Sequence, residues 1–250
     1  MKVIKTVVVF DQGGLIDSKE WAKTHSTYTK AIRAMVHPEG SKKFVIRRRT
    51  SKKDSLGART SQWNRNGVTA IKQQFLEKLK DLKWQMEEPL NISSILASSQ
   101  VKNPKAKDLF IEYPSKKVIS EPLHISVGDI DCYFKLPNSF RAAIEWETGN
   151  ISSSHRSMNK LCLALMTGQV EIGVLVVPSR KFYPHLTDRI GNWMELSPYL
   201  HFWKKVGGFV SKGILAVTVV EQDELTDNPK VPYIRQGTAG RSAEGSAKIK

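Results

Sequence analysis

The sequence predicts an α/β fold with a mixed central β-sheet flanked by helices. Two observations support this prediction: apolar segments of strand length alternate with amphipathic segments of helix length, and 250 residues are enough to bury a full hydrophobic core. We expect an N-terminal extension with a basic loop over residues 1–65, a core over residues 66–234, and a flexible C-terminal arm over residues 235–250.

The N-terminal part of the chain has weak periodicity. Glycines, a proline and a run of basic residues interrupt residues 1–69. We therefore expect a short strand there, a helix over residues 21–36, and loops.

Residues 70–86 predict an amphipathic helix, because apolar side chains recur in them at helical spacing. Pro89 is expected to end this helix and to leave Glu87 and Glu88 beside its C-terminus. Carboxylates are unfavourable at that end of a helix dipole, so a bound cation would stabilise them. The alternative is that both acids are ordinary surface residues.

Two runs of alternating apolar residues predict a β-hairpin. The runs are residues 130–136 and 140–147, and the Pro-Asn-Ser segment between them is typical of a turn. Period-two alternation places the apolar side chains of each run on one face of the sheet and the acids on the other. The hairpin is therefore expected to present a row of carboxylates.

The acids of this hairpin are candidate metal ligands. Symmetry about Asn138 places Asp131 opposite Glu145, and Asp129 opposite Glu147. Like charges directly across a ladder destabilise it unless cations or protons offset them. Because the cluster offers only oxygen ligands, Mg²⁺ is the favoured ion, and the alternative is a solvated acidic face on an edge hairpin.

The C-terminal half continues the α/β alternation. A helix is expected over residues 153–167, with the serine run at 152–154 available to cap it and Gly168 to stop it. Strands are predicted over residues 171–177 and 214–220. A mixed segment with a helix or turn over residues 193–202 separates them.

The strongly basic composition indicates a polyanionic partner. The formal net charge is +15 and the pI about 9.8. Residues 41–60 contain eight basic residues and one acid, Asp54, so this segment carries +7. Contact with a nucleic-acid backbone explains the segment better than a solvated loop. A carboxylate metal cluster inside a basic protein favours chemistry on phosphodiesters, because metals offset the repulsion between an acidic site and an anionic substrate.

Other classes of protein receive little support. The two cysteines cannot form a disulfide framework, and the six histidines lack ligand spacing. Apolar runs are too short to span a membrane and no targeting segment is recognisable, so a cytoplasmic location fits. A nuclease is favoured over a noncatalytic basic DNA-binding protein, and an assay on plasmid DNA with and without Mg²⁺ separates the two.

The segment from Glu145 to Lys160 carries a specific resemblance. Its sequence, Glu-Trp-Glu-Thr-Gly-Asn-Ile-Ser-Ser-Ser-His-Arg-Ser-Met-Asn-Lys, closely resembles the BamHI family of type II restriction endonucleases, within the PD-(D/E)XK nuclease superfamily. The resemblance covers residues 66–240. It recurs in Asn66-Gly67-Val68, Glu87-Glu88-Pro89-Leu90, Gly128-Asp129-Ile130-Asp131, Leu186-Thr187-Asp188-Arg189, Asn192 and Pro198-Tyr199.

This resemblance implies a restriction-endonuclease-like core and Mg²⁺-dependent hydrolysis of DNA. Asp131, Glu145 and Glu147 fall on the family's catalytic carboxylates and Glu87 on a fourth acid of its active site; Asp131, Glu145 and Glu87 are the implied metal ligands. The superfamily usually has lysine where Glu147 stands, and the Glu-x-Glu form is the BamHI variant. Asp129 falls where the family has a different residue type.

The resemblance also implies how DNA is read. The positions that match the family's major-groove contacts are Asn150, Ser152, Arg156, Asp188 and Arg189, and the C-terminal arm contributes Gly237 and Arg241 as DNA-binding residues. The palindrome GGATCC is the first expectation for the target, and a different target specificity is the alternative. A palindrome implies a homodimer, with residues 153–167 and 193–202 at its interface. A DNA methyltransferase of the same specificity is the implied genetic partner.

Overall fold

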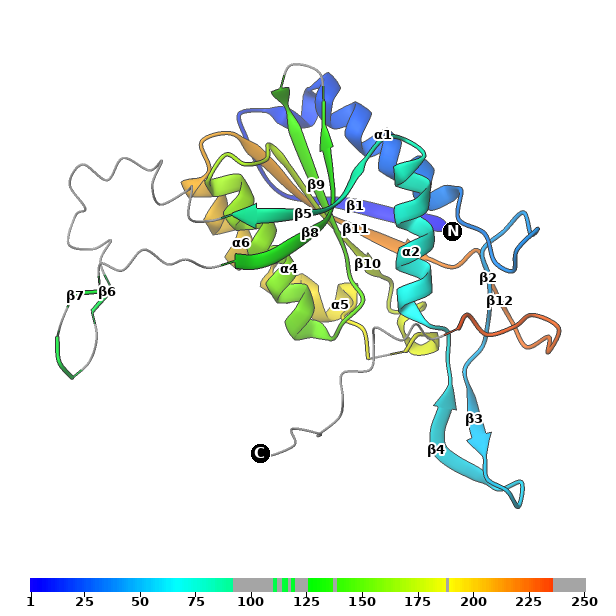
Figure 1. Ribbon diagram of the computed structural model, residues 1–250. Helices are drawn as coiled ribbons and strands as arrows, with labels where there is room; N and C mark the ends of the chain where they lie inside the picture. Colours follow the sequence, from blue (N-terminus) through cyan, green and yellow to red (C-terminus); the bar gives the residue numbers. More distant parts are fainter. Residues whose placement is uncertain are drawn as a thin grey trace.

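The computed structural model describes residues 1–91, 110–111, 114–116, 118–119, 126–136, 139–187 and 189–235, and a six-stranded mixed sheet organises them (Figure 1). In spatial order its strands are β1 (Lys2–Gln12), β11 (Gly213–Glu221), β10 (Ile172–Pro178), β9 (Arg141–Trp146), β8 (Ser126–Lys135) and β5 (Gln85–Asn91). Strand β10 runs parallel to β9 and β11, and the outer pairings are antiparallel. The predicted α/β fold with a mixed central sheet is confirmed.

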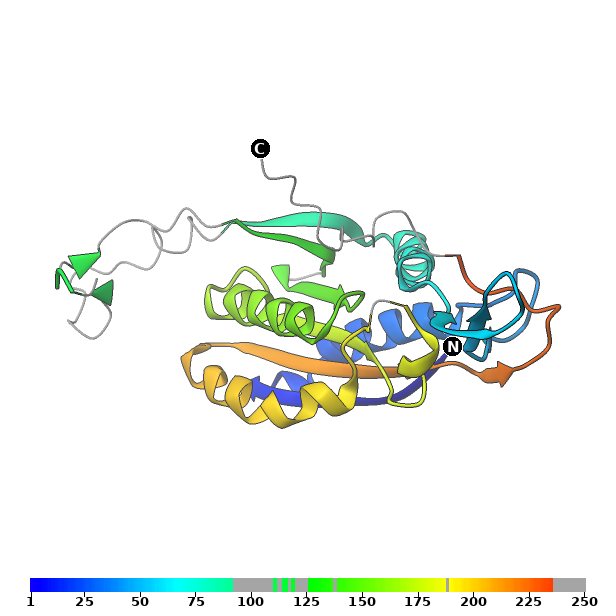
Figure 2. The same ribbon diagram turned by 90° about the horizontal axis from the view of Figure 1, so that it is seen from below.

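Helices cover both faces of the sheet (Figure 2). Alternate strand residues divide between two buried clusters: Val174 and Val176 pack with one, Leu175 and Val177 with the other. The first cluster includes side chains of α1 (Lys19–Arg33) and α2 (Val68–Lys80). The second includes side chains of α4 (Ile151–Met166), α5 (Trp193–Leu196) and α6 (Leu200–Val206).

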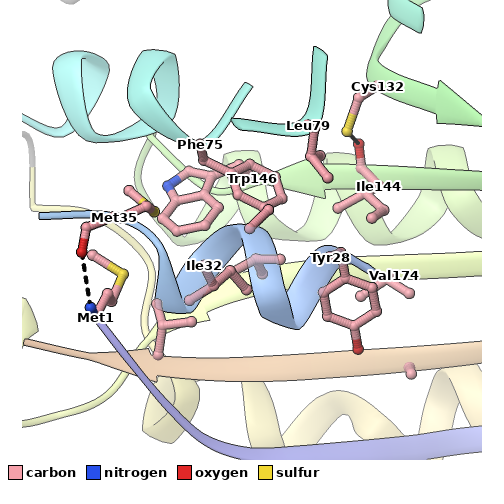
Figure 3. Close-up of a cluster of buried hydrophobic side chains, with 14 of the residues drawn as sticks. Met1, Tyr28, Ile32, Met35, Phe75, Leu79, Cys132, Ile144, Trp146 and Val174 are labelled. Carbon is pink, nitrogen blue, oxygen red and sulfur yellow. Dashed lines mark hydrogen bonds between the residues drawn. The ribbon is translucent and has the colours of Figure 1, made fainter. Parts of the chain in front are cut away.

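The cluster under α2 fixes the strand that carries the acids. The Phe75 ring lies 4.6 Å from the Trp146 ring, centroid to centroid, and Leu79 and Ile144 are fully buried beside them (Figure 3). Because Ile144 and Trp146 point into this cluster, Glu145 between them points to the opposite face, toward α4. The alternation expected for this strand is therefore confirmed.

The β8–β9 hairpin has the expected register. The pairs Cys132↔Ile144 and Phe134↔Ala142 are those that symmetry about Asn138 requires. The last regular pair at this end of the ladder is Cys132↔Ile144. Asp131 and Glu145 therefore lie just beyond the regularly paired region.

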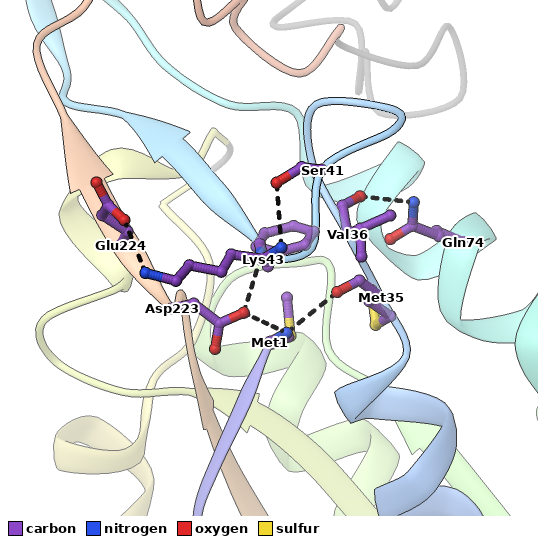
Figure 4. A network of polar contacts seen from close by, with 9 residues as sticks. Met1, Met35, Val36, Ser41, Lys43, Gln74, Asp223 and Glu224 are labelled. Carbon is purple, nitrogen blue, oxygen red and sulfur yellow. Dashed lines mark hydrogen bonds and ion pairs between the residues drawn. The ribbon is translucent and has the colours of Figure 1, made fainter.

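The first residues of the chain belong to the central sheet. Strand β1 pairs antiparallel with β11 along its whole length. The backbone nitrogen of Met1 donates to the carbonyl of Met35 at 3.1 Å and lies 2.9 Å from a carboxylate oxygen of Asp223 (Figure 4). Residues 1–65 thus contribute a sheet strand and a core helix, whereas the division of the chain at residues 65 and 234 stays a prediction.

The helix expected over residues 70–86 is shorter than the sequence predicts. Helix α2 ends at Lys80, the chain turns through Lys83 with a positive φ of 67°, and Gln85–Asn91 form β5. The residues after Leu79 pack against β8 instead: the ring of Trp84, just before β5, stacks on the ring of Phe134 with the centroids 5.0 Å apart. Glu87 and Glu88 therefore lie on a strand, and the argument from a helix dipole does not apply to them.

The remaining elements lie close to their expected positions. Helix α4 begins two residues early and is capped by the side chain of Asn150, which accepts from Ser153 N, and not by the serine run; Gly168 follows its end with φ 63°. Residues 193–202 form α5, a 3-10 turn and part of α6. None of the helices in the described ranges has the length and apolar character needed to cross a lipid bilayer.

Short elements complete the chain. They are the 3-10 helices η1 (Leu15–Asp17), η4 (Tyr183–His185), η5 (Ser197–Tyr199) and η6 (Gly207–Phe209), and the paired strands β2 (Val45–Arg47) with β12 (Glu224–Thr226), β3 (Thr50–Lys53) with β4 (Arg59–Asn64), and β6 (Phe110–Ile111) with β7 (Val118–Ile119). Strands β2, β3, β4 and β12 differ from the prediction, because residues 41–60 were expected to form a basic loop and no strand was expected after residue 220.

Candidate active site

Glu145 lies near the end of β9, between the sheet and α4. Its carboxylate is only 3 % exposed. Oε1 lies 2.5 Å from the ammonium of Lys160, and Oε2 accepts a hydrogen bond from the Ser157 hydroxyl at 3.2 Å. Both partners stand on α4, three residues apart, so the same helix face presents them to the strand.

Asp131 lies beside Glu145 on the neighbouring strand. Its Oδ2 accepts a hydrogen bond from the backbone nitrogen of Trp146 at 2.8 Å, which ties β8 to β9 beyond the last regular pair. Its Oδ1 lies 2.5 Å from the ammonium of Lys72 on α2. The two carboxylates thus have separate lysine counter-ions, which come from helices on opposite faces of the sheet.

Glu147 follows β9 directly and is more isolated. Its side chain is 2 % exposed, and Oε1 accepts from the backbone nitrogen of Gly149 at 2.6 Å. No lysine or arginine of the described residues pairs with it. Burial raises the pKa of Glu147 to about 7, and the nearby Ser154 hydroxyl and the backbone nitrogens of Gly149 and Thr148 moderate that rise.

The pKa of Glu145 is also raised to about 7. Burial is the main cause and the negative charge of Asp131 adds to it, whereas the ammonium of Lys160 acts in the opposite direction. Two neighbouring glutamates whose pKa values are raised toward neutral pH are typical of a functional site, because folding alone gives no reason to bury them.

Of the other two acids considered from the sequence, the structure describes the side chain of Asp129 but only the backbone of Glu87. Glu87 lies on β5 between the pairs Met86↔Cys132 and Glu88↔Ile130, so its backbone is level with Asp131. Its side chain lies outside the described part of the structure. Asp129 is exposed, and its backbone carbonyl accepts a hydrogen bond from the Lys160 ammonium at 2.7 Å.

The fit of a metal ion can be tested on these residues. Asp131, Glu145 and Glu147 offer carboxylate oxygens, the ligands of hard cations such as Mg²⁺. No group of three or more metal-ligating side chains is assembled within the described residues, and lysine ammoniums neutralise Asp131 and Glu145. Because cations already stand beside both carboxylates, a divalent ion suits the charge of the site and would take over the role of these ammoniums.

The predicted base-reading residues gather around the start of α4. Asn150, Ser152 and Arg156 are exposed there, and Arg189 is exposed with a positive φ of 47°. The backbone nitrogen of Gly191 donates to the carbonyl of Gly149 at 2.8 Å, which holds the two segments together.

The close approach of residue 191 to the start of α4 requires a glycine at that position. A Cβ atom there would lie 2.1 Å from the Ser154 hydroxyl and 3.2 Å from Cα of Ile151. Three of the predicted DNA-binding residues, Asp188, Gly237 and Arg241, lie outside the described residues.

Sequence reasoning missed Lys72 and Lys160 as members of the site. Neither was predicted to be part of it, and Lys72 lies 59 residues before Asp131 in the sequence. The one available signal was the spacing of Ser157 and Lys160 on a helix that directly follows Glu147. Lys72 could be found only from the tertiary packing of α2 against the sheet.

Comparison with known proteins identifies the family. The family model described as restriction endonuclease BamHI matches residues 1–241. The chain belongs to the BamHI family of restriction endonucleases. The type II restriction enzyme OkrAI of Oceanobacter kriegii is 31% identical over 212 residues, covering 85% of each chain. The type II restriction enzyme BamHI of Bacillus amyloliquefaciens is 31% identical over 224 residues, covering 88% of this chain and 83% of its own.

The fold of the BamHI family member described here also resembles a solved structure. The crystal structure of restriction endonuclease BglII complexed with a DNA 16-mer superimposes with a TM-score of 0.53 and 10% identity, covering 95% of this chain and 89% of that chain. At this identity the likeness shows the fold. Membership of the BamHI family shows the activity: the protein is a type II site-specific deoxyribonuclease.

Proposed function

We propose that the protein cleaves both strands of DNA at the palindrome GGATCC by Mg²⁺-dependent hydrolysis. The single observation that carries the catalytic part is the pair of buried glutamates, Glu145 and Glu147, beside the partly buried Asp131; burial raises the pKa of both glutamates to about 7. The target follows from the family resemblance of the base-reading positions. A nuclease of the same family with another target is the alternative.

Asp131 and Glu145 would hold the metal, with Glu87 supporting it from β5. When bound, Mg²⁺ would polarise the scissile phosphate and lower the pKa of an attacking water. Until then Lys72 and Lys160 keep the two carboxylates apart and oriented, through contacts of 2.5 Å each. The Trp146 backbone nitrogen fixes the other oxygen of Asp131.

Glu147 would orient or deprotonate the attacking water. A general base works best when its pKa is close to the working pH, and burial brings the pKa of Glu147 to about 7. Its Oε1 is held by Gly149 N, which leaves Oε2 for the water. The absence of a lysine partner among the described residues also favours Glu147, and not Glu145, for this role.

Asn150, Ser152, Arg156, Asp188 and Arg189 would read bases in the major groove, and Gly237 and Arg241 would contact DNA from the C-terminal arm. Arginine can donate two hydrogen bonds to guanine O6 and N7. Two observations support this assignment for Arg156 and Arg189. Both side chains are exposed, and neither has an ion-pair partner among the described residues, so both guanidinium groups are available to bases.

Replacement of Arg189 by alanine should lower the discrimination between GGATCC and single-base variants by about 1–3 kcal/mol, because one bidentate base contact is lost. Competition binding with the two duplexes measures this. Arg180→Ala is the matched control, since Arg180 is exposed and stacks on Tyr183 at 5.1 Å. Equal discrimination by Arg189→Ala and the wild type would rule out a base-reading role.

The protein would act as a homodimer, because a palindrome presents the same bases to two symmetric subunits. Large apolar side chains are exposed along the interface that the resemblance indicates. They are Met166 (41%), Met194 (60%), Tyr199 (48%) and Phe202 (63%). Exposed large apolar side chains gathered on the same two segments are typical of a subunit contact.

Phe202→Asp should weaken dimerisation by at least about 2 kcal/mol, as expected for loss of a central aromatic anchor with burial of a charge. Sedimentation over a range of protein concentrations measures this. Ile16→Asp is the control, because Ile16 is 47% exposed on η1, which lies outside residues 153–167 and 193–202. If both variants sediment as the wild type does, the subunit contact lies elsewhere.

Cleavage of matched oligonucleotide duplexes tests the proposed function. One duplex contains GGATCC and the other differs from it by a single base pair. We expect both strands of the first to be cut in Mg²⁺ and neither in EDTA, with the second left intact. A methyltransferase that modifies the same sequence is the expected genetic partner, so methylation of the duplex should block cutting. Equal cutting of both duplexes would exclude this specificity.

A further inference from the structure

The β3–β4 hairpin projects from the body of the protein beside the start of α2 (Figures 1 and 2). Its strands Thr50–Lys53 and Arg59–Asn64 pair only with each other and form a separate two-stranded sheet. An isolated two-stranded hairpin is marginally stable in water, so it contributes little to the fold. Its sequence is therefore free to serve another purpose.

The outer part of the hairpin carries unpaired positive charge. Lys52, Lys53 and Arg59 are exposed, and within the described residues no carboxylate lies at ion-pair distance from them. Asp54 is the nearest acid in sequence, but its Oδ1 accepts hydrogen bonds from the backbone nitrogens of Leu56 and Ala58 at 2.9 and 2.8 Å. That carboxylate closes the turn and does not pair with the lysines.

Two of these cations stand directly opposite each other. Lys53 pairs with Arg59 across the ladder, an arrangement that destabilises a hairpin. The one comparable pair in the central sheet, Lys135↔Arg141, differs, because Glu171 lies 2.7 Å from the Arg141 guanidinium. The Lys53–Arg59 pair has no such acid among the described residues, so an external anion would relieve its repulsion.

The base of the hairpin is fixed to the segment that leads to Arg189. Asn66, two residues after β4, donates its backbone nitrogen to the carbonyl of His185 at 2.8 Å and accepts from Thr187 N at 2.9 Å. On the other strand, Arg49 N donates to His185 Nδ1 at 3.2 Å. The hairpin therefore keeps a fixed position relative to a segment that is predicted to read bases.

A second set of contacts fixes the same base to the residues before the C-terminal arm. The side-chain oxygen of Asn66 accepts from Ile234 N at 3.2 Å, and Gly67 N donates to the carbonyl of Ile234. The Tyr233 hydroxyl donates to the carbonyl of Arg48 at 2.7 Å. The hairpin thus starts beside residues 185–187 and 233–234, which precede two of the predicted DNA-binding segments in the sequence.

We propose that the β3–β4 hairpin is an arm that contacts phosphates of double-stranded DNA outside the recognition sequence. The proposal rests on the proposed function, because that function supplies the DNA. Strand β4 has 6 residues and extends about 20 Å, at roughly 3.3 Å per residue, which equals about six base pairs of duplex. Lys52, Lys53 and Arg59 contact phosphates and no bases, so the arm adds affinity without sequence preference.

Binding to duplexes of two lengths tests the arm. The probes are duplexes of about 12 and about 30 base pairs, each with GGATCC or a scrambled sequence at its centre, in Ca²⁺ buffer, since Ca²⁺ permits binding with little cutting. The triple variant Lys52→Ala, Lys53→Ala, Arg59→Ala should bind the long duplexes at least about tenfold more weakly, with a log–log salt dependence shallower by about 2 to 3. Its affinity for the short duplexes should equal that of the wild type.

Two controls separate charge from damage to the fold. Lys19→Ala, Lys23→Ala, Lys30→Ala removes the same charge from exposed positions of α1 and should leave binding to both lengths close to wild type. Lys52→Arg, Lys53→Arg should retain the full length dependence.

The outcomes also separate the arm from the proposed target. Equal weakening on short and long duplexes, or no weakening on either, would overturn the proposal. Failure of the GGATCC specificity would instead appear as equal wild-type affinity for the central GGATCC and scrambled sequences, with the effect of the arm still measurable on both.

Discussion

Glu145→Ala is expected to reduce DNA cleavage by at least about 10³-fold, because a metal ligand contributes several kcal/mol of transition-state stabilisation. Specific binding should stay close to that of the wild type, since Glu145 is 3 % exposed on the opposite side of β9 from Trp146 and its contacts are Ser157 and Lys160. Single-turnover cleavage and binding in Ca²⁺ measure the two effects separately.

Asp129→Ala is the matched control for this change. Asp129 is an exposed acid on the strand next to Glu145, and its interaction with Lys160 is through the backbone carbonyl, which the substitution leaves in place. Its cleavage rate should remain within a few-fold of wild type. Glu145→Gln keeps the shape of the side chain and should lose cleavage as Glu145→Ala does. Near-normal turnover by either Glu145 variant in Mg²⁺ would remove Glu145 from the active site.

Glu147→Gln is expected to make the metal-free protein more stable at pH 8. The folded-state pKa of about 7, against an ordinary value of 4.5, means that ionising Glu147 in the folded state costs more than in the unfolded chain. The difference of about 2.5 pH units corresponds to roughly 3 kcal/mol at 1.36 kcal/mol per unit. Removing the charge should recover about 2–3 kcal/mol in urea-induced unfolding.

The stability gained by Glu147→Gln should increase with pH. Below about pH 4.5 both states hold the proton, so the substitution has little effect there. Between pH 4.5 and 7 the unfolded chain releases the proton first, the native state loses stability as pH rises, and above pH 7 the full penalty is present. Glu77→Gln, at an exposed position of α2, should show no such gain. A Glu147→Gln variant that is less stable than wild type at pH 8 would contradict the assigned cause.

The same carboxylate that destabilises the fold is the one proposed to handle the water. Added Mg²⁺ should narrow the difference between wild type and Glu147→Gln, because a cation bound nearby favours the ionised glutamate. Loss of cleavage together with a gain in stability is the expected combination for a functional residue whose charge is buried.

The acidic hairpin could be predicted from sequence because its causes are local. Period-two alternation and a short turn set which residues face each other, and the pairs Cys132↔Ile144 and Phe134↔Ala142 confirm that register. The burial of Glu145 and Glu147 was not predictable in the same way. It depends on α4 and on the sheet packing around them.

The helix prediction over residues 70–86 failed for a physical reason. Leu79 and Met86 fit helical spacing, but Trp84 and Met86 also fit a strand, and short apolar patterns cannot distinguish the two. The turn passes through Lys83 with a positive φ, a conformation that a glycine usually indicates in a sequence and that a lysine does not. Long-range pairing of β5 with β8 then decides the structure, and it brings Glu87 level with Asp131.

The lysines of the site could not be predicted because they come from distant elements. Lys72 and Asp131 are 59 residues apart in sequence, and their contact exists only because α2 packs across the sheet. The exposed residues around α4 were assigned by resemblance alone. The hydrogen bond between Gly191 and Gly149 joins the segment that carries Arg189 to the start of α4, the helix that carries Arg156.

Mapping the ends of a plasmid of known sequence after digestion tests both the cleavage activity and the target sequence. We predict that the purified protein in Mg²⁺ produces double-strand ends only at GGATCC sites, that EDTA abolishes them, and that Glu145→Ala produces none. Ends at another sequence, ends scattered along the plasmid, or an intact plasmid in Mg²⁺ would contradict the account of this site.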